Sequence, residues 1–123
     1  MTSLVSKKIR MKNKPWESEP HHLLTEHLGY VLEIKRHEIL KHLCGYIYLP
    51  ESHPDYGKTY DEVDVDVHGG LTFSEGGKFG FDCAHAGDFE PGNTFHCDDD
   101  VYRTVDFVLA ELHKLAEQFD RRK

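Results

Sequence analysis

The sequence has no long hydrophobic run and few cysteines. No apolar stretch approaches the roughly 20 residues that a membrane-spanning helix needs, and the N-terminus lacks the apolar core of a cleaved signal peptide. The three cysteines, Cys44, Cys83 and Cys97, form no CxxC pair, so a disulfide framework is not expected. These absences predict a cytoplasmic protein that is not bound to a membrane.

The glycine-rich loops GxGxxG and GxxxxGK[ST], which bind phosphates, are also absent. The chain is acidic, with a net charge of −7 over 123 residues. Residues 1–16 hold five basic and no acidic side chains, which leaves −12 on residues 17–123. Because an acidic body repels a phosphate backbone, duplex nucleic acid is an unfavourable partner. We expect residues 1–16 to be a flexible basic arm and residues 17–123 to be one domain.

The first half of the body is predicted to contain a short helix and two strands. Glu17–Tyr30 is predicted to hold the helix, with Ser18 as its N-cap and Gly29 just beyond its end. Tyr30–Arg36 alternates between apolar and polar residues, and Leu43–Pro50 is rich in aromatic and β-branched residues, so both are predicted strands.

The C-terminal part of the chain has the clearest helical pattern. Its apolar residues recur at intervals of three or four: Val101, Val105, Val108, Leu109, Leu112, Leu115, Ala116 and Phe119. This stripe predicts an amphipathic helix of about six turns. Asp98–Asp100 suit its N-cap, and Arg121–Lys123 lie at the negative end of its dipole. The fold class is therefore α+β: an antiparallel sheet of about four strands packed on this helix.

The central stretch predicts a hairpin. From Val63 to Ser74, odd positions are apolar or glycine and even positions are polar or glycine. Since successive side chains of a strand point to opposite faces, this pattern predicts one long strand. Glu75–Gly77 has the glycine-rich composition typical of a turn. Lys78–Ala84 is the predicted return strand, with Cys83 facing the core.

The polar face of this hairpin holds the candidate site. A register that pairs Phe73 with Phe79 would place His68 diagonal to Asp82, whereas a bulge at Gly69–Gly70 would re-aim His68. The candidate ligand-binding residues are Asp64, Asp66, His68, Gly69, Gly70, Thr72, Asp82, His85 and Asp88.

Three interpretations of this face are open. It is a solvated outer face, or a polar ligand pocket in which the glycines let a ligand approach the backbone, or a site for Mg²⁺, Mn²⁺ or Zn²⁺. The candidate metal ligands are Asp66, His68, Asp82, His85 and Asp88. Zinc bound by the Cys83–His85 and His96–Cys97 segments is less favoured, because their intervals match no established zinc motif.

Two strings in this region, "CGYIYLPESHPDYGKTYDEVDVDVHGGLTFS" and "GFDCAHAGD", are distinctive. With the C-terminal amphipathic helix, they resemble a family of short proteins from tailed-phage, prophage and bacterial genomes. The similarity covers Cys44–Asp88 and, more loosely, Tyr102–Gln118. The resemblance implies the cytoplasm of a bacterial host cell, and it transfers no catalytic roles.

Two classes of function are compatible with these observations. The first is a binding module, because small phage accessory proteins often act on host defence by binding a host protein or a small, nucleotide-like polar ligand. The second is a metal-dependent phosphoester hydrolase, with His68 and His85 as ligands or bases and Asp66, Asp82 and Asp88 holding the metal. Binding is favoured, since no recognised catalytic arrangement appears. A homodimer is also compatible with a sheet that only one helix covers.

Overall fold

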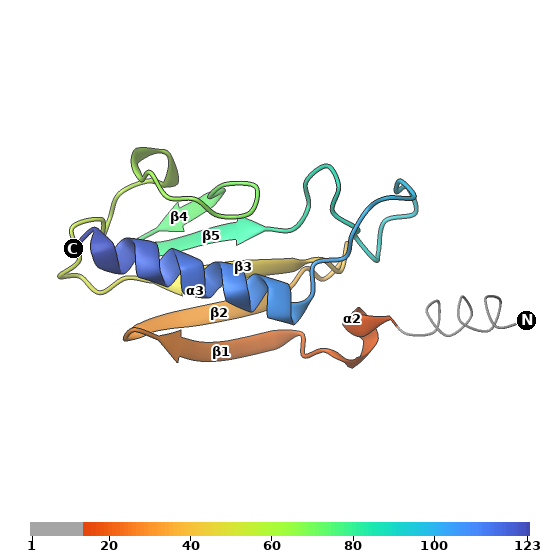
Figure 1. Cartoon of the computed structure of the whole chain (residues 1–123), viewed down its shortest axis with the longest axis horizontal. Coiled ribbons are helices and arrows are strands. Elements are labelled where there is room, and N and C mark those ends of the chain that lie inside the picture. Colours follow the sequence, from red (N-terminus) through yellow and green to blue (C-terminus); the bar gives the residue numbers. More distant parts are fainter. Residues whose placement is uncertain (1–13) are drawn as a thin grey trace, which may run out of the picture.

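A five-stranded antiparallel sheet and one long helix form the body of the protein (Figure 1). The computed structural model describes residues 14–123, so most of the predicted basic arm lies outside the described residues. The strands are β1 (His22–His27), β2 (Tyr30–Arg36), β3 (Leu43–Tyr48), β4 (Phe73–Glu75) and β5 (Lys78–Asp82). Their order across the sheet is β1-β2-β3-β5-β4, and every neighbouring pair is antiparallel. The predicted α+β class is confirmed, with five strands in place of about four.

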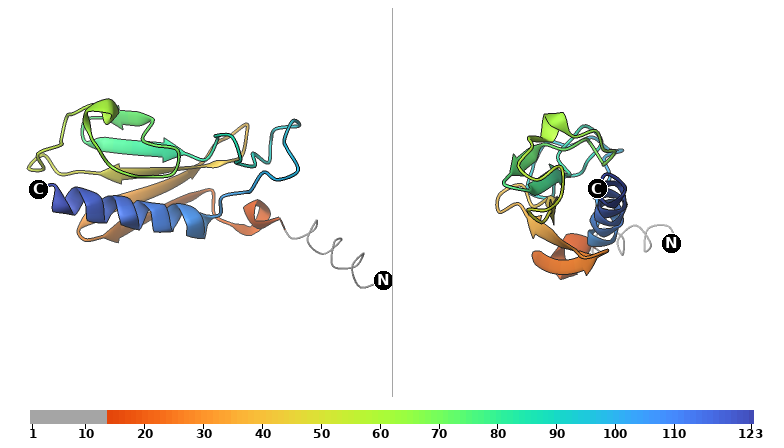
Figure 2. Two further views of the ribbon diagram at one scale, coloured as in Figure 1. Left: turned by 45° about the horizontal axis from the view of Figure 1, so that its top comes forward. Right: turned by 90° about the vertical axis from the view of Figure 1, so that its left-hand side faces the viewer.

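The core lies between the sheet and α3 (Val105–Arg121), which runs along one face of the sheet (Figure 2). The buried face of α3 consists of Val108, Leu112, Leu115, Ala116 and Phe119. It packs on sheet residues that include Leu32, Ile34, Ile47, Phe79 and Phe81, each at most 1% exposed. Burying a side chain of this size contributes roughly 1.5–3 kcal/mol. Gly45 permits the close packing, because a Cβ there would lie 2.7 Å from the Phe81 ring and 3.1 Å from Val108.

The long helix begins later than its apolar stripe predicts. Asp98–Asp100 do not cap it; the N-cap is Thr104, whose hydroxyl accepts a hydrogen bond from the Phe107 amide at 3.1 Å. Val101, predicted to lie on the buried stripe, is 49% exposed. The Val101 backbone instead exchanges hydrogen bonds with Gly87 and Phe89, each at 2.8 Å. These contacts hold the chain extended and delay the start of α3.

The helix predicted within Glu17–Tyr30 is wrong for most of its length. Only α2 (Pro15–Ser18) is helical, and His22–His27 is instead the edge strand β1, paired with β2. Leu28 and Gly29 form the two-residue turn between these strands, with φ of 54° and 85°. Such a turn matches the twist of a hairpin. Pairing with β2 therefore outweighs the local helical pattern.

The long strand predicted over Val63–Ser74 is also wrong in its first part. Only Phe73–Glu75 is paired in the sheet, although the alternation of burial is as predicted: Val63 and Val67 are buried, while Asp64 and Asp66 are exposed.

The segment before β4 runs beside α3 because helix side chains hold its backbone. The Asp66 amide donates to Gln118 Oε1 and the His68 amide donates to Glu111 Oε1, both at 2.7 Å. These acceptors take the place of a neighbouring strand.

The β4–β5 hairpin has a different register from the predicted one. Phe73 pairs with Gly80 and Ser74 with Phe79, so the expected Phe73–Phe79 pair is wrong by one residue. The predicted turn at Gly76–Gly77 is confirmed, with φ of 52° and 86°. As a result, Phe73 lies against the Tyr46 ring, at 5.7 Å between centroids.

Candidate functional site

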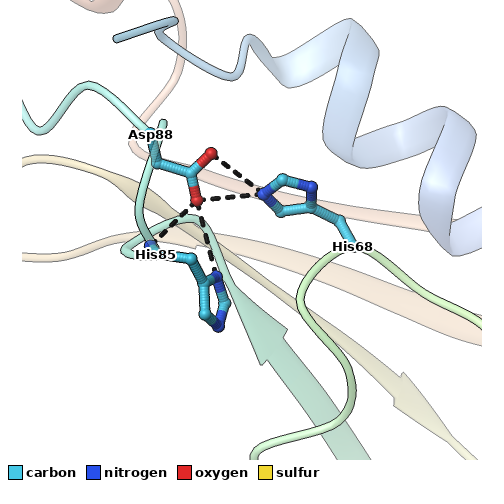
Figure 3. A group of neighbouring side chains, drawn as sticks. All are labelled: His68, His85 and Asp88. Carbon is cyan, nitrogen blue, oxygen red and sulfur yellow. Dashed lines mark hydrogen bonds and ion pairs between the residues drawn. The ribbon is translucent and has the colours of Figure 1, made fainter.

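The structure brings together three of the predicted site residues: His68, His85 and Asp88 (Figure 3). One ligand atom from each lies within 4.8 Å of the other two. His68 comes from the segment beside α3, whereas His85 and Asp88 come from the loop after β5. We call these three residues the His-His-Asp cluster.

Local backbone structure positions each member of the cluster. After His68 the chain turns back, with the Gly70 amide bonded to the Val67 carbonyl at 2.8 Å. His68 and Gly69 are the central residues of this turn, and Gly69 and Gly70 have φ of 68° and 81°, so the suggested bulge within a strand is replaced by a turn. Asp88 is held by an isolated parallel bridge to Val101, just before α3.

Asp88 is the centre of the cluster, and its side chain is only 1% exposed. Oδ1 accepts a hydrogen bond from Arg103 Nε at 2.8 Å, and Oδ2 accepts one from the His85 amide at 3.0 Å. His68 Nε2 lies 2.9 Å from Oδ2 and 3.0 Å from Oδ1. Both oxygens therefore have partners within the protein.

These contacts keep Asp88 ionised. Burial alone would raise the pKa of this carboxyl. The hydrogen bonds from Arg103, His68 and the His85 amide outweigh burial, so the pKa of Asp88 lies below its usual range. The result is a buried carboxylate with a cation on one side and an imidazole on the other.

His85 has two carboxylate neighbours and one unpaired atom. Its Nδ1 lies 3.5 Å from Asp88 Oδ2, and its Nε2 lies 3.6 Å from Asp82 Oδ1. Nδ1 is buried and has no hydrogen-bond partner among residues 14–123. The ring sits against Gly69, where a Cβ would lie 2.2 Å from His85 Cε1. Gly69 is therefore required for the close approach of His85.

Aromatic contacts support His68 and Arg103. The His68 ring stands edge-on to Phe107 at 5.1 Å and to His85 at 5.7 Å, measured between centroids. The Arg103 guanidinium lies 5.1 Å from the centre of the Phe107 ring. Phe107 thus contacts two of the side chains that lie against Asp88, those of His68 and Arg103. Neither Arg103 nor Phe107 carried a signal in the sequence that linked it to the site.

Other predicted site residues lie apart from the cluster. Asp66 is predicted as a metal ligand, but its side chain is 91% exposed and its carboxylate faces Lys114, 3.7 Å away. Asp64 is exposed as well. Both predictions depended on a strand pairing that does not form. Thr72 donates a hydrogen bond to Asp82 at 3.2 Å, and this pair lies at the edge of the site.

Cys83 is not available for metal binding or catalysis. Its side chain faces the core, as predicted, and is 1% exposed. Burial raises the pKa of the Cys83 thiol far above its usual range. Because the thiolate is the reactive and metal-binding form, both the zinc site through Cys83 and a role for Cys83 as a nucleophile are unfavourable.

A cavity of about 640 Å³ that is widely open to solvent lies beside the cluster. It is lined by residues 84–88, Glu90, residues 94–97 and Asp100, so His85 and Asp88 belong to both the cavity and the cluster. Phe95, in this lining, is 86% exposed. Of residues 90–100, only His96–Cys97 were linked to His85 from the sequence, in the less favoured zinc site. The other residues of this stretch carried no such signal, because they approach the loop after β5 only in the folded chain.

Within residues 14–123, no helix is both long enough and apolar enough to cross a membrane. Comparisons with protein-family models, with curated proteins and with solved structures found no match to this chain. The chemistry of the site is therefore inferred from its own geometry.

Proposed function

We propose that this protein is a small accessory protein of phage or prophage type that binds a small, polar, nucleotide-like ligand. The observation that carries the proposal is the cavity of about 640 Å³ beside the His-His-Asp cluster. Its volume lies within the roughly 300–1,000 Å³ typical of small-molecule sites. The phage setting is supported by the resemblance of Cys44–Asp88 to phage and prophage proteins.

The lining of the cavity suits a ligand with a ring and several polar groups. Phe95 offers an exposed aromatic face, on which a base can stack. Glu90 and Asp100 supply acceptors for amino or hydroxyl groups. Because Asp88, Glu90 and Asp100 are acidic, a phosphate group needs a cation before it can approach this wall. The ligand is therefore a neutral polar molecule or a phosphate bound together with a metal ion.

Calorimetry of the full chain with a set of nucleosides, nucleotides and cyclic dinucleotides tests the proposal, with and without Mg²⁺ or Mn²⁺. We expect binding by at least one compound, and we expect Phe95→Ala to weaken it by about tenfold, since stacking on an aromatic side chain is worth about 1–3 kcal/mol per base. Leu24→Ala, which changes an equally apolar but distant exposed residue on β1, is the matched control. Absence of binding under all conditions would contradict the proposal.

A metal-dependent phosphoester hydrolase is the second candidate. It is favoured by one arrangement: the imidazole of His68 and the guanidinium of Arg103 both contact the Asp88 carboxylate. A metal ion there would supply a water nucleophile, with His68 either as a ligand of the ion or as the base that accepts the proton of that water. Hydrolysis of bis(4-nitrophenyl) phosphate with Mn²⁺ or Zn²⁺ is the test, and activity that persists in His68→Ala would eliminate this candidate.

A further inference from the structure

We infer that His68, His85 and Asp88 form a three-ligand site for a divalent transition-metal ion of the Zn²⁺ type, with an open coordination position. The inference rests on the proposed function, because it assigns the ion to the wall of the same cavity. Two imidazoles and one carboxylate are a donor set typical of Zn²⁺ and related ions, and they suit Ca²⁺ poorly. Three protein ligands leave the fourth position for water or a ligand.

The distances within the cluster fit such an ion. Bonds of about 2.0–2.1 Å in tetrahedral geometry separate neighbouring ligand atoms by about 3.3 Å. Asp88 Oδ2 lies 2.9 Å from His68 Nε2 and 3.5 Å from His85 Nδ1. Figure 3 shows both rings approaching this carboxylate from different sides. Each of the three ligand atoms lies within 4.8 Å of the other two.

The unpaired ring nitrogen of His85 also favours a bound ion. The contact with Asp88 accounts for the His68 ring, but it leaves the buried Nδ1 of His85 without a hydrogen-bond partner among the described residues. On the other side of the ring, Nε2 lies 3.6 Å from the Asp82 carboxylate, about as far as Nδ1 lies from Asp88. The metal-binding tautomer is the one with its proton on Nε2, toward Asp82. The lone pair of Nδ1 then faces Asp88. Carboxylates commonly orient metal-binding imidazoles in this way.

Arg103 does not block the site. Its Nε binds Oδ1 of Asp88, whereas the His85 ring and the His85 amide lie near Oδ2. His68 Nε2 lies between the two oxygens, 2.9 Å from Oδ2 and 3.0 Å from Oδ1. An ion can therefore take Oδ2 while Arg103 keeps Oδ1. Such outer hydrogen bonds fix the orientation of a ligating carboxylate. The positive charge of Arg103 lowers the affinity for the ion, and the Asp82 carboxylate beside His85 offsets part of this effect.

Gly69 is a positioning residue for the proposed site, because it leaves room for the His85 ring. Gly69 and its neighbour Gly70 therefore provide a matched pair of variants. A side chain at Gly69 would collide with the His85 ring, where Cε1 lies 2.2 Å and Nδ1 2.5 Å from the added Cβ. Gly70 has a similar positive φ, 81°, but nothing lies within 4 Å of an added Cβ. Gly69→Ala and Gly70→Ala therefore impose a similar backbone strain, and only the first displaces His85.

The test is zinc binding by the metal-free full chain, measured by calorimetry and by metal content after dialysis, with no nucleotide present. We expect one Zn²⁺ per chain, and we expect His85→Ala to weaken binding by about 100-fold, since one of three protein ligands is lost. Gly69→Ala should bind zinc about tenfold or more weakly than Gly70→Ala, which carries a similar backbone strain without displacing His85. Asp66→Asn should retain wild-type affinity. Circular dichroism verifies that each variant is folded.

Several results would overturn the inference: no zinc binding by the wild type, equal binding by His85→Ala, or a loss of binding in Cys97→Ser, which would assign the ion to the exposed Cys97 instead. Failure of the site and failure of the proposed function are distinguishable. Zinc binding without any nucleotide binding contradicts the proposed function alone. Nucleotide binding that a chelator and His85→Ala leave unchanged, with no zinc bound, contradicts the metal site alone.

Discussion

At the scale of single residues, Asp55 is the clearest buried charge outside the candidate site. Its side chain is 2% exposed, and it accepts hydrogen bonds from Arg122 Nε at 2.7 Å and Nη2 at 3.1 Å. Lys58 Nζ lies 3.0 Å away. The hydrogen bonds from Arg122, together with Lys58, lower the pKa of Asp55 from 3.8 to about 2. These contacts fasten the loop after β3 to the C-terminal end of α3.

The pKa of Asp55 makes stability depend on pH. Because the pKa is lower in the folded chain, the stabilisation is complete above pH 4 and is lost as the pH falls from about 4 to 2. We expect this carboxyl to contribute roughly 2 kcal/mol to the loss, measured by urea unfolding between pH 2 and 5.

Asp55→Asn is the control for this pH dependence. We expect Asp55→Asn to be less stable at neutral pH and to lose less stability than the wild type below pH 4. The comparison isolates Asp55, because the pKa of Asp88 is lowered as well and contributes equally to both proteins. An identical loss of stability in the wild type and Asp55→Asn would contradict the assignment.

At the scale of elements, the sequence correctly predicted the strands and the helix face whose residues follow a local periodicity. Strands β2 and β3 and the apolar face of α3 follow from residues that are adjacent in the sequence or one helical turn apart. The predicted elements were wrong where the backbone forms hydrogen bonds with groups that are distant in the sequence. His22–His27 became a strand because β2 pairs with it, and the segment before β4 left the sheet because Glu111 and Gln118 bind its amides.

The start of α3 gives a testable prediction at this scale. Thr104 caps the helix through the Phe107 amide, so Thr104→Ala should reduce the free energy of unfolding by about 1 kcal/mol. Asp98→Ala, at the start predicted from sequence, should leave it unchanged within about 0.5 kcal/mol, because Asp98 is exposed and precedes the first helical residue by seven positions. Chemical denaturation of both variants measures the difference, and a larger effect of Asp98→Ala would show that the helix begins earlier.

At the scale of the whole molecule, the candidate site shows how far sequence reasoning reaches. The cluster residues His68, His85 and Asp88 were all predicted, because a histidine and acid pattern beside glycines is visible in the sequence. Asp66 was grouped with them through a strand that does not form, and it lies at Lys114 instead. Arg103 was missed, because its contact with Asp88 depends on the path of residues 89–103 around the end of the sheet. Which residues belong to a site built from separate segments therefore depends on the tertiary structure.

The N-terminal segment joins the elements of the whole molecule at one end. Trp16 packs on Phe89 and Tyr102, with ring centroids 5.3 and 4.9 Å away. Glu19 accepts hydrogen bonds from the Tyr102 hydroxyl at 2.6 Å and from the Val105 amide at 2.8 Å. The folded body therefore begins before residue 17, and this segment contacts the start of α3 and the loop that carries Arg103.

Because of these contacts, we expect the N-terminal segment to unfold together with the sheet and α3. Trp16 is the only tryptophan in the sequence, so its fluorescence reports this segment alone. In urea, the fluorescence and far-ultraviolet circular dichroism curves should have the same midpoint, as a two-state transition requires. Glu19→Gln should lower both midpoints equally, because it weakens contacts at the first turn of α3 and at Tyr102. A fluorescence change that precedes the circular dichroism change would show instead that the segment undocks from an intact body, and the loop of the candidate site would then lose its support before the fold does.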